Sequence, residues 1–255
     1  MALLTDGLIN TNGDLQKYEN GILDLASTEA IDVSAKAILA QDEIATELQL
    51  FLNRTSHWDP RFFVGQRFDI NQVVVTGPLR RWHAYRTLAL VYQDAYNNQL
   101  NDRYKGKWAE YDKLSVAAAK TLFEVGAGMV YQPLPKAPEP SLSIVPMAVT
   151  GTNYFARISW VSASGQEGAA SDVVQATSGD GSAVQLTPPV SPPAVELWNV
   201  YAGTGPDNVQ LQNPAPLKTS DAWMLPSSGL RNGRLPGTGQ SPGWWVMDRH
   251  VLPRG

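Results

Sequence analysis

Apolar and polar positions alternate with a helical period along much of the first half of the chain. The clearest stretch is 78–125, where two apolar seams recur at spacings of three and four on either side of a short polar junction at 97–102. This pattern predicts two antiparallel helices, with Pro78 at the first helical position and Asn101 or Asp102 as N-cap of the second helix. The large aromatic residues assigned to their packing and interface are Trp82, Tyr85, Tyr92, Tyr104, Trp108 and Tyr111.

A third apolar stripe precedes this hairpin. It predicts a helix from a cap at Ser27 or Thr28 to about Asn53, which closes a three-helix bundle with the hairpin. Residues 1–26 are interrupted by Asp-Gly and Asn-Gly pairs and are interpreted as an irregular lead-in. Residues 54–77 are too apolar for a free linker, so we expect a long loop with a short strand at 73–75, packed on the bundle.

The pattern changes after Val125. Only Pro60 and Pro78 of the 18 prolines precede this point, and four prolines fall between 133 and 140. The sequence therefore predicts a helical-bundle domain at 1–131, a proline-rich linker at 132–140, a β-sandwich at 141–242 and a C-terminal arm at 243–255. The fold class expected is α+β multidomain, an antiparallel helical bundle followed by a small all-β domain.

Short alternating segments with turn residues between them follow the linker. Two sets of residues alternate along one such segment: Tyr154, Ala156, Ile158 and Trp160, and between them Phe155, Arg157, Ser159 and Val161. Residues 165–168 then turn the chain into a returning segment at 171–177. Residues 178–181 carry a hairpin signal, and 196–202 form another strand. Together these features are typical of an antiparallel sandwich.

The last thirteen residues have no evident place in that sandwich. They are apolar with basic residues near the end, and they follow a Gly/Pro break. We interpret them as an arm that docks on a partner. The proposed apolar anchors are Trp244, Trp245, Met247, Val251 and Leu252, with Arg249 and Arg254 pairing to acids on that partner.

Composition narrows the class of protein. The chain has no cysteine, which excludes disulfides, thiolate metal sites and a cysteine nucleophile. Neither a signal peptide nor a membrane span is expected from the apolar runs. The formal charge is −4, and 1–131 hold 13 Lys and Arg against 16 Asp and Glu, so no basic nucleic-acid surface is predicted.

Candidate chemistry is sparse. His57, His83 and His250 lie in unrelated contexts without a second ligand at helical spacing, so no metal site and no cofactor are predicted. The glycine pairs at 203–205 and 237–239 lack the spacing and the following helix of a phosphate loop, and no nucleophile elbow is present. We expect a protein that is not an enzyme.

The helical hairpin resembles a known family. The run from Arg80 to Leu122 is similar to the paired helices of phage head-to-tail connector adaptors, in the small and aromatic residues of its first helix, the polar turn and the positions that follow it. The residues that carry the resemblance are Ala84, Tyr85, Leu88, Leu90, Tyr92, Asp94, Tyr104, Lys107, Tyr111 and Leu114. It covers roughly 27–125, and these are helix-packing residues without a chemical signature.

The resemblance implies a mechanical function in the virion. Adaptor subunits would form a homo-oligomeric ring, expected as a dodecamer, under the portal protein at the neck, and would contact a stopper or tail-terminator protein. The protein would be made in the host cytoplasm and would make passing contact with DNA in the channel. Its mildly acidic bundle fits such a channel, because a phosphate backbone must slide past without being held.

The second half resembles a fibronectin type III or immunoglobulin-like module. The segment 151–174 is similar to the last hairpin of such modules, which places Tyr154 near their tyrosine corner, and 198–203 is similar to an interior strand. The hairpin stands before this strand, in contrast to the usual order.

Two other functions remain open from the sequence. Tryptophans on a β-domain stack on sugars or fill a core; core is favoured for Trp198, and an interface is at least as favourable for Trp244 and Trp245. One alternative is therefore a carbohydrate-binding or host-adhesion module on a helical stalk. The other is a capsid decoration protein.

Overall fold

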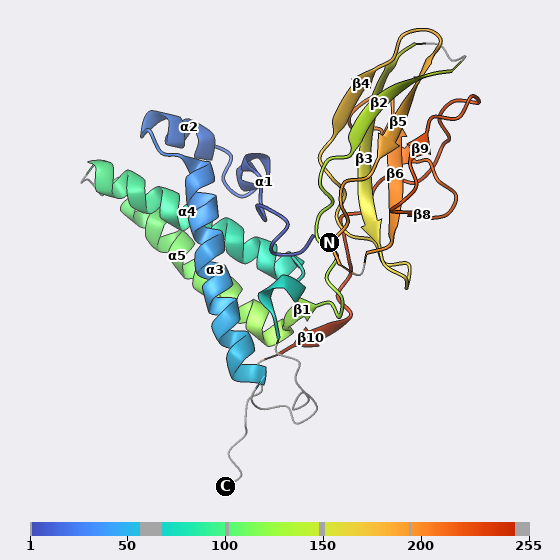
Figure 1. Cartoon of the computed structure of the whole chain (residues 1–255). Coiled ribbons are helices and arrows are strands. Elements are labelled where there is room, and N and C mark those ends of the chain that lie inside the picture. The colour runs from blue at the N-terminus through green and yellow to red at the C-terminus, as the bar shows by residue number, and fades with distance from the viewer. Residues whose placement is uncertain (1, 57–67, 100–101, 148–150, 194, 248–255) are drawn as a thin grey trace. The chain divides into compact units, whose positions relative to one another are not determined.

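The chain is an α+β protein with helices in its first half and antiparallel sheets in its second half. A computed structural model describes residues 2–56, 68–99, 102–147, 151–193 and 195–247 (Figure 1). The contacts divide the chain into two compact units. The β unit comprises Met1–Asp6 and Gln132–Ser241, and the helical unit comprises Gly7–Tyr131 and Pro242–Gly255. The α+β layout expected from the sequence is confirmed.

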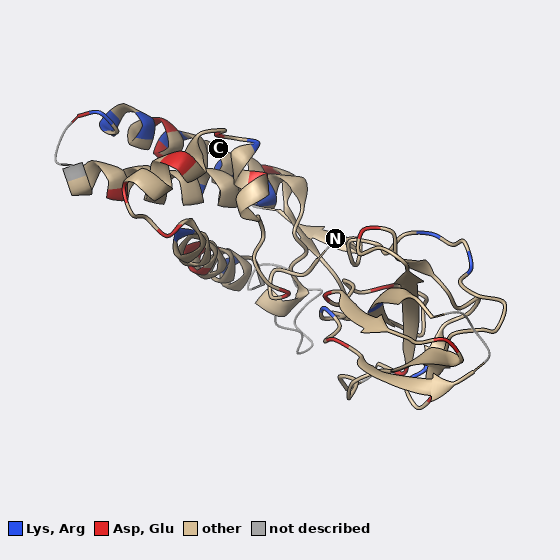
Figure 2. Cartoon of the chain, turned by 90° about the horizontal axis from the view of Figure 1, so that it is seen from above, with Lys and Arg blue, Asp and Glu red and all other residues tan. Residues whose placement is uncertain are grey.

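The helical unit is built on one central helix. The helix α4 (Gly77–Gln99) packs against α3 (Val33–Ser56) and against α5 (Lys105–Val125), and Figure 2 shows α4 between the other two. Two short helices, α1 (Asn12–Gln16) and α2 (Ile22–Thr28), contact each other and both contact α4. This position explains why most of the middle of α4 is buried.

The start of α3 differs from the sequence expectation. The helix predicted from Ser27 is two helices, because α2 ends at Thr28 and Ala30 adopts a left-handed conformation with φ of 54°. The amide of Ile31 then donates to the carbonyl of Ala26, and the Asp32 carboxylate accepts from the amides of Ser34 and Ala35. The helix is therefore interrupted here, because Asp32 caps a new helix in place of continuing α2.

The second helix of the hairpin also starts later than predicted. The residue at the N-cap of α5 is Tyr104, and it makes no side-chain capping bond. Asp102 therefore does not cap this helix, and Asn101 lies outside the described residues. Pro78 lies in the first turn of α4, as predicted.

A small sheet closes one end of the helical unit. Strand β1 (Ala127–Met129) pairs antiparallel with β10 (Trp244–Val246), and on its other side Val73 bridges Met129. The turn from α5 into β1 is made by Gly126, whose φ of 106° favours glycine. The short strand expected near 73–75 thus exists as an isolated bridge, preceded by a 3₁₀ turn, η2 (Ile70–Gln72); residues 57–67 of the predicted loop lie outside the described part.

The β unit consists of two antiparallel sheets that share one apolar core. One sheet has the order β2 (Ser141–Pro146), β5 (Ser182–Thr187), β9 (Trp223–Met224). The other has the order β4 (Val174–Thr177), β3 (Asn153–Val161), β6 (Leu197–Gly203), β7 (Gln210–Leu211), with β8 (Leu217–Lys218) also on β6. The strand predicted here is present as β3, and one of its alternating sets, Tyr154, Ala156, Ile158 and Trp160, is buried in this core.

Two details of the β unit differ from the sequence interpretation. Residues 178–181 do not form a hairpin, because β4 and β5 belong to different sheets and the turn carries the chain from one sheet to the other. The segment 132–140 belongs to the β unit, with Leu134 and Ala137 in its core and the amide of Lys136 donating to Asp6 Oδ1 at 2.6 Å. It is therefore a packed edge of the unit.

Candidate interaction surfaces

The aromatic residues singled out in the hairpin form an aromatic layer between α4 and α5, in which Trp82 packs on Phe123 and the others belong to one apolar cluster. Trp82, Tyr92, Tyr104 and Tyr111 are buried, and Tyr85 and Trp108 are half-buried. Tyr92 stacks on Tyr111 with ring centroids 5.6 Å apart, and Tyr96 stacks on Trp108 at 5.7 Å. Because aromatic side chains bury large areas, this layer holds the hairpin together. All six residues pack inside the helical unit, and an interface role for them stays a prediction.

Two carboxylates, which the sequence analysis did not identify, accept hydrogen bonds from tyrosine hydroxyl groups of this layer. The Tyr111 hydroxyl donates to Glu19 Oε2 at 2.7 Å, and Lys107 Nζ lies 3.2 Å from the same oxygen. The Tyr104 hydroxyl donates to Glu29 Oε1 at 2.8 Å. The bond from Tyr111 lowers the pKa of Glu19, whereas burial, with Glu19 nearby, raises the pKa of Tyr92 to about 12. The loops flanking α2 are thereby tied to the hairpin.

His83 is a buried packing residue of α4. Its Nε2 donates to the carbonyl of Ala37 at 3.0 Å, and its Nδ1 lies 2.9 Å from the side-chain nitrogen of Asn10, which also donates to the carbonyl of Arg80. This arrangement requires a neutral ring, because Nδ1 must accept. Burial lowers the pKa of His83 to about 4, against the opposing effect of the Ala37 carbonyl.

We expect His83 to make the helical unit sensitive to acid. Its pKa lies below the ordinary value of 6.5, so the folded state binds fewer protons than the unfolded state between about pH 4 and 6.5. The stabilisation is fully present above pH 6.5 and is lost as the pH falls through that window, by about 3 kcal/mol in total. Unfolding free energies across the window would check this loss.

The measurement is sharpest in a background with a single histidine. In the variant H57Q/H250Q, His83 is the sole imidazole, and its NMR titration reports its pKa directly. A midpoint near 6.5 in the folded protein would contradict the neutral, buried state. The further variant H83Q should flatten the pH dependence of stability between pH 4 and 6.5.

The C-terminal strand lies on its own helical unit. Trp244 of β10 packs on Phe68 with ring centroids 5.0 Å apart and on Tyr131 at 6.1 Å, and Val246 is buried. The amide of Gly243 donates to the carbonyl of Met129 at 2.8 Å. The segment that enters the helical unit at Pro242 therefore lies beside the segment that leaves it at Tyr131.

Of the predicted anchors of the arm, some pack inside the protein, some are exposed and some lie outside the described residues. The side chain of Trp244 is used within the chain, while Trp245 and Met247 are 44% and 52% exposed. Arg249, Val251, Leu252 and Arg254 lie outside the described residues. Docking of the arm on a partner stays a prediction, and among the described anchors its available side chains are Trp245 and Met247.

A partly buried carboxylate, 13% exposed, organises the outer face of the larger sheet in the β unit. Glu167 follows β3 and accepts bonds from Tyr201 at 2.5 Å and Asn199 at 3.2 Å. It also accepts from the hydroxyl of Ser159 and, at 2.5 Å, from the guanidinium of Arg234. Ser159 and Asn199 are cross-strand partners, so β3 and β6 present these donors side by side.

This network has the properties of a structural clamp. Burial of Glu167 opposes its ionisation, but the four donors outweigh burial and lower the pKa of this carboxyl below its usual value. Arg234 also lies over the ring of Tyr201, with 5.8 Å between the guanidinium carbon and the ring centroid. Because the carboxylate is ionised and supplied with donors, it joins a distant loop to the sheet and is poorly suited to proton transfer.

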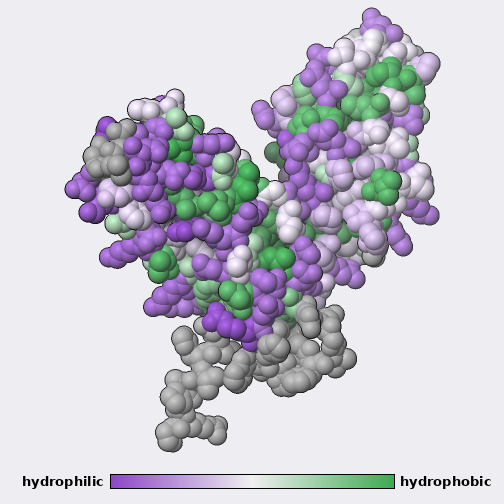
Figure 3. All heavy atoms as spheres, turned by 60° about the vertical axis from the view of Figure 1, so that its left-hand side comes forward, coloured by the Kyte–Doolittle hydropathy of each residue, from purple (hydrophilic) through white to green (hydrophobic). Residues whose placement is uncertain are grey.

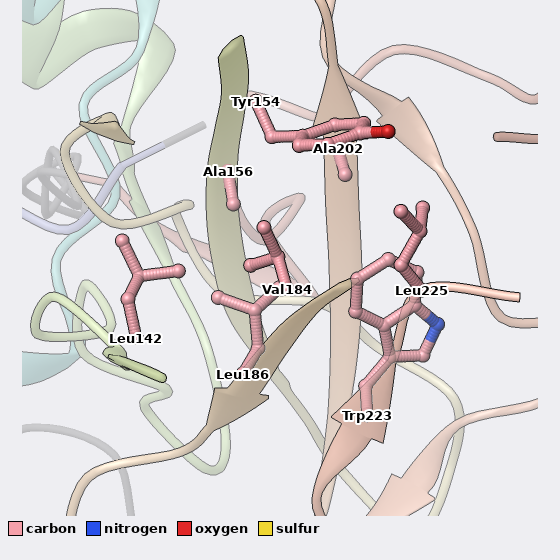
Figure 4. A pocket seen from close by; sticks show the side chains of 8 residues that line it. All are labelled: Leu142, Tyr154, Ala156, Val184, Leu186, Ala202, Trp223 and Leu225. Carbon is pink, nitrogen blue, oxygen red and sulfur yellow. The ribbon is translucent and has the colours of Figure 1, made fainter. Parts of the chain in front are cut away.

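A small apolar pocket opens between the two sheets of the β unit (Figure 4). Its walls come from both sheets and from the residue after β9, and they are apolar apart from one tyrosine. The lining residues are Leu142, Tyr154, Ala156, Val184, Leu186, Ala202, Trp223 and Leu225. Ligand sites usually add a few polar groups that fix orientation. This pocket lacks such a set and is best explained as incomplete packing of the core.

The tryptophans of the β unit are core residues. Trp198 is fully buried and donates from Nε1 to the carbonyl of Lys218 at 2.8 Å, and Trp223 is 8% exposed. The prediction of a core position for Trp198 is confirmed. Neither ring offers an open face on which a sugar could stack.

Within the described residues, no group of three or more His, Asp or Glu side chains is placed to hold a metal ion. The helices of that part of the chain also include none with the length and apolarity needed to cross a membrane.

No protein-family model matches the chain, and no curated protein matches it significantly.

Proposed function

We propose that the protein is a structural head-to-tail adaptor of a tailed bacteriophage, which forms a ring under the portal, extends the DNA channel and joins head to tail. The observation that carries the proposal is the α4–α5 hairpin with its aromatic layer, covered by α3. This is the arrangement implied by the resemblance of 27–125 to connector adaptors, and its packing residues are the ones on which that resemblance depends.

The chemistry of the described residues is in keeping with a mechanical role. The buried His83 and the partly buried Glu167 are held by internal partners and serve packing. The helical half carries a small acidic excess, and its basic residues are dispersed among acidic ones along α5 (Figure 2). Such a surface would let DNA pass without binding it tightly.

The β unit is proposed to be an immunoglobulin or fibronectin type III-like sandwich. In support, β3, β4, β6 and β7 have the order and antiparallel pairing of the C, C′, F and G strands, and β2 and β5 pair on the opposing sheet as B and E do. The buried Trp160 stands on the strand equivalent to C. On this assignment the first hairpin is C–C′, which removes the apparent change of strand order.

The tyrosine-corner assignment is then less favourable. Tyr154 lies on the strand equivalent to C and lines the apolar pocket, whereas the corner tyrosine belongs to strand F. On the F equivalent, β6, the Tyr201 hydroxyl donates to the Glu167 side chain and not to the backbone. The proposed module therefore replaces the corner with the Glu167 clamp.

Electron microscopy of the full chain mixed with its cognate portal tests the function. We expect a ring of extra density on the tail-facing end of the portal, coaxial with it, formed by bound copies of this chain. A sample of portal alone is the control. Density at scattered positions on capsids, or binding to glycans without portal binding, would replace the adaptor by one of the two alternatives.

A further inference from the structure

The surface of α3 that faces away from α4 carries an exposed stripe with coiled-coil spacing. Its members recur at intervals of three and four, and all are exposed: Ala35, Leu39, Asp42, Thr46, Leu50 and Asn53. Leu39 and Leu50 are 43% and 58% exposed. A stripe of this spacing that includes exposed leucines is typical of a helix that packs on another helix.

A second stripe runs along the outer surface of α5. Its members also recur at intervals of three and four, and all are exposed: Gly106, Ala109, Lys113, Val116, Lys120 and Glu124. Val116 is 66% exposed. Small side chains dominate the first part of this stripe and allow another helix to approach closely. Figure 3 shows apolar surface of the helical unit as separate areas among hydrophilic surface.

The two stripes lie on opposite sides of the helical unit. Because α4 separates α3 from α5 over most of their length, the outer surfaces of the flanking helices point in opposite directions (Figure 2). Contact between α3 of one copy and α5 of another is therefore heterologous. Such contacts repeat from copy to copy and generate a closed ring when the rotation between copies closes.

Size and charge are complementary between the stripes. The α3 stripe offers two large leucines, and the α5 stripe offers glycine and alanine as holes for them. Asp42 on α3 and Lys113 on α5 are exposed, and neither has an ion pair with another described residue. Lys120 lies in the same stripe, but it is paired with Glu124 at 3.8 Å and adds no net charge to it. The stripes therefore complement each other through one acidic and one basic side chain, Asp42 and Lys113, and through leucines on α3 against small residues at the start of α5.

We propose that the α3 stripe of one copy packs on the α5 stripe of the next copy, and that this contact joins the subunits of the ring. That this contact builds a ring rests on the proposed function. The contact between copies is inferred from the two exposed stripes alone. The occupant of each stripe is a second copy of this chain.

Engineered cysteines test the contact cleanly, because the chain has none of its own. The single variants L39C and V116C and the double variant L39C/V116C are treated with a short bismaleimide, alone at high protein concentration and with the portal. We expect neither single variant to cross-link with itself. An equal mixture of the two should give a covalent dimer, and the double variant should give a ladder of oligomers.

The control is V190C, at a position that is 95% exposed in the β unit. It should give no more cross-link when mixed with L39C than it gives by itself. Dimers of L39C alone or of V116C alone would overturn the heterologous contact in favour of a two-fold one. No cross-link between positions 39 and 116 in either sample would overturn the proposal altogether.

The cross-links and the electron microscopy separate the two proposals. A ladder without portal binding would support the contact and reject the adaptor function. A coaxial ring on the portal without the 39–116 cross-link would support the function and reject this contact.

Discussion

Replacing Trp244 with alanine is expected to destabilise the helical unit by about 3 kcal/mol. The side chain packs on Phe68 and Tyr131, and its strand closes the small sheet beside β1. Its loss leaves a gap between these rings and loosens the strand that keeps Val246 buried. Peptide-resolved hydrogen exchange is the appropriate measurement, because two units need not unfold together. Faster exchange should appear in 68–76 and 127–131.

The neighbouring tryptophan supplies a matched control. Trp245 alternates with Trp244 along β10 and is 44% exposed, so W245A should change the stability by less than about 1 kcal/mol. Equal effects of the two variants would contradict the placement of Trp244 inside the helical unit. If W245A instead weakens binding to a partner while stability is kept, the predicted docking of the arm gains its first support.

This geometry changes what a deletion of the arm would report. From the sequence, removal of 243–255 is expected to abolish assembly and to leave the fold unchanged. The structure shows that the deletion also removes β10 from its own unit. Loss of assembly in such a deletion would therefore not separate lost docking from lost stability. The W244A and W245A pair makes that separation.

The helices were predictable because their signal is local. Apolar residues at intervals of three and four predict a helix with one buried side, whichever element packs against it. The short junction between α4 and α5 then predicts that the two helices form a hairpin. The boundary between α2 and α3 was missed because it depends on one residue, Ala30, in a left-handed conformation. Alanine is the strongest helix former, so its propensity predicts that the helix continues through this residue.

The arrangement of the strands was less predictable because pairing is non-local. The signal at 178–181 indicates a turn, but whether the turn joins paired strands or changes sheets depends on β2, some 35 residues earlier. The strand at the C-terminus was interpreted as a free arm for the same reason. Its partner β1 lies more than 110 residues away, beyond the whole β unit, and no local pattern marks that pairing.

The hydrogen-bonding roles of Glu19 and Glu167 were also not predictable from the sequence pattern. Glu19 and Glu167 stand in loops where a solvated surface charge is the usual outcome. Their donors come from tyrosines that the periodicity had assigned to packing or to a strand. A tyrosine in an apolar seam needs a partner for its hydroxyl, and this need is the one signal that would have prompted a search for nearby acids.

Replacing Glu167 with glutamine is expected to destabilise the β unit by about 3 kcal/mol. The substitution keeps the shape of the side chain but removes the charge that pairs with Arg234 and places an amide group where donors converge. The loop that carries Arg234 should loosen from the sheet. Hydrogen exchange in 228–236 should rise more than exchange in the helical unit.

The pH dependence of this effect has a defined sign. Because the folded-state pKa of Glu167 lies below its ordinary value, its stabilisation is present above about pH 4.5 and is lost as the pH falls through the lowered pKa. The difference in stability between wild type and E167Q should therefore shrink below pH 4.5. A difference that grows in acid would mean that the carboxyl is protonated in the folded protein.

A double-mutant cycle with R234M separates the ion pair from the other bonds to Glu167. Arg234 is 53% exposed, so screening by solvent limits its share, and we expect a coupling energy of about 1 kcal/mol. The remaining loss in E167Q then belongs to the buried donors, Ser159, Tyr201 and Asn199. E196Q, at an exposed glutamate of the same unit, is the matched control and should change the stability by less than about 0.5 kcal/mol. If E167Q and E196Q were equally mild, Glu167 would not be the residue that holds the outer loops on the sheet.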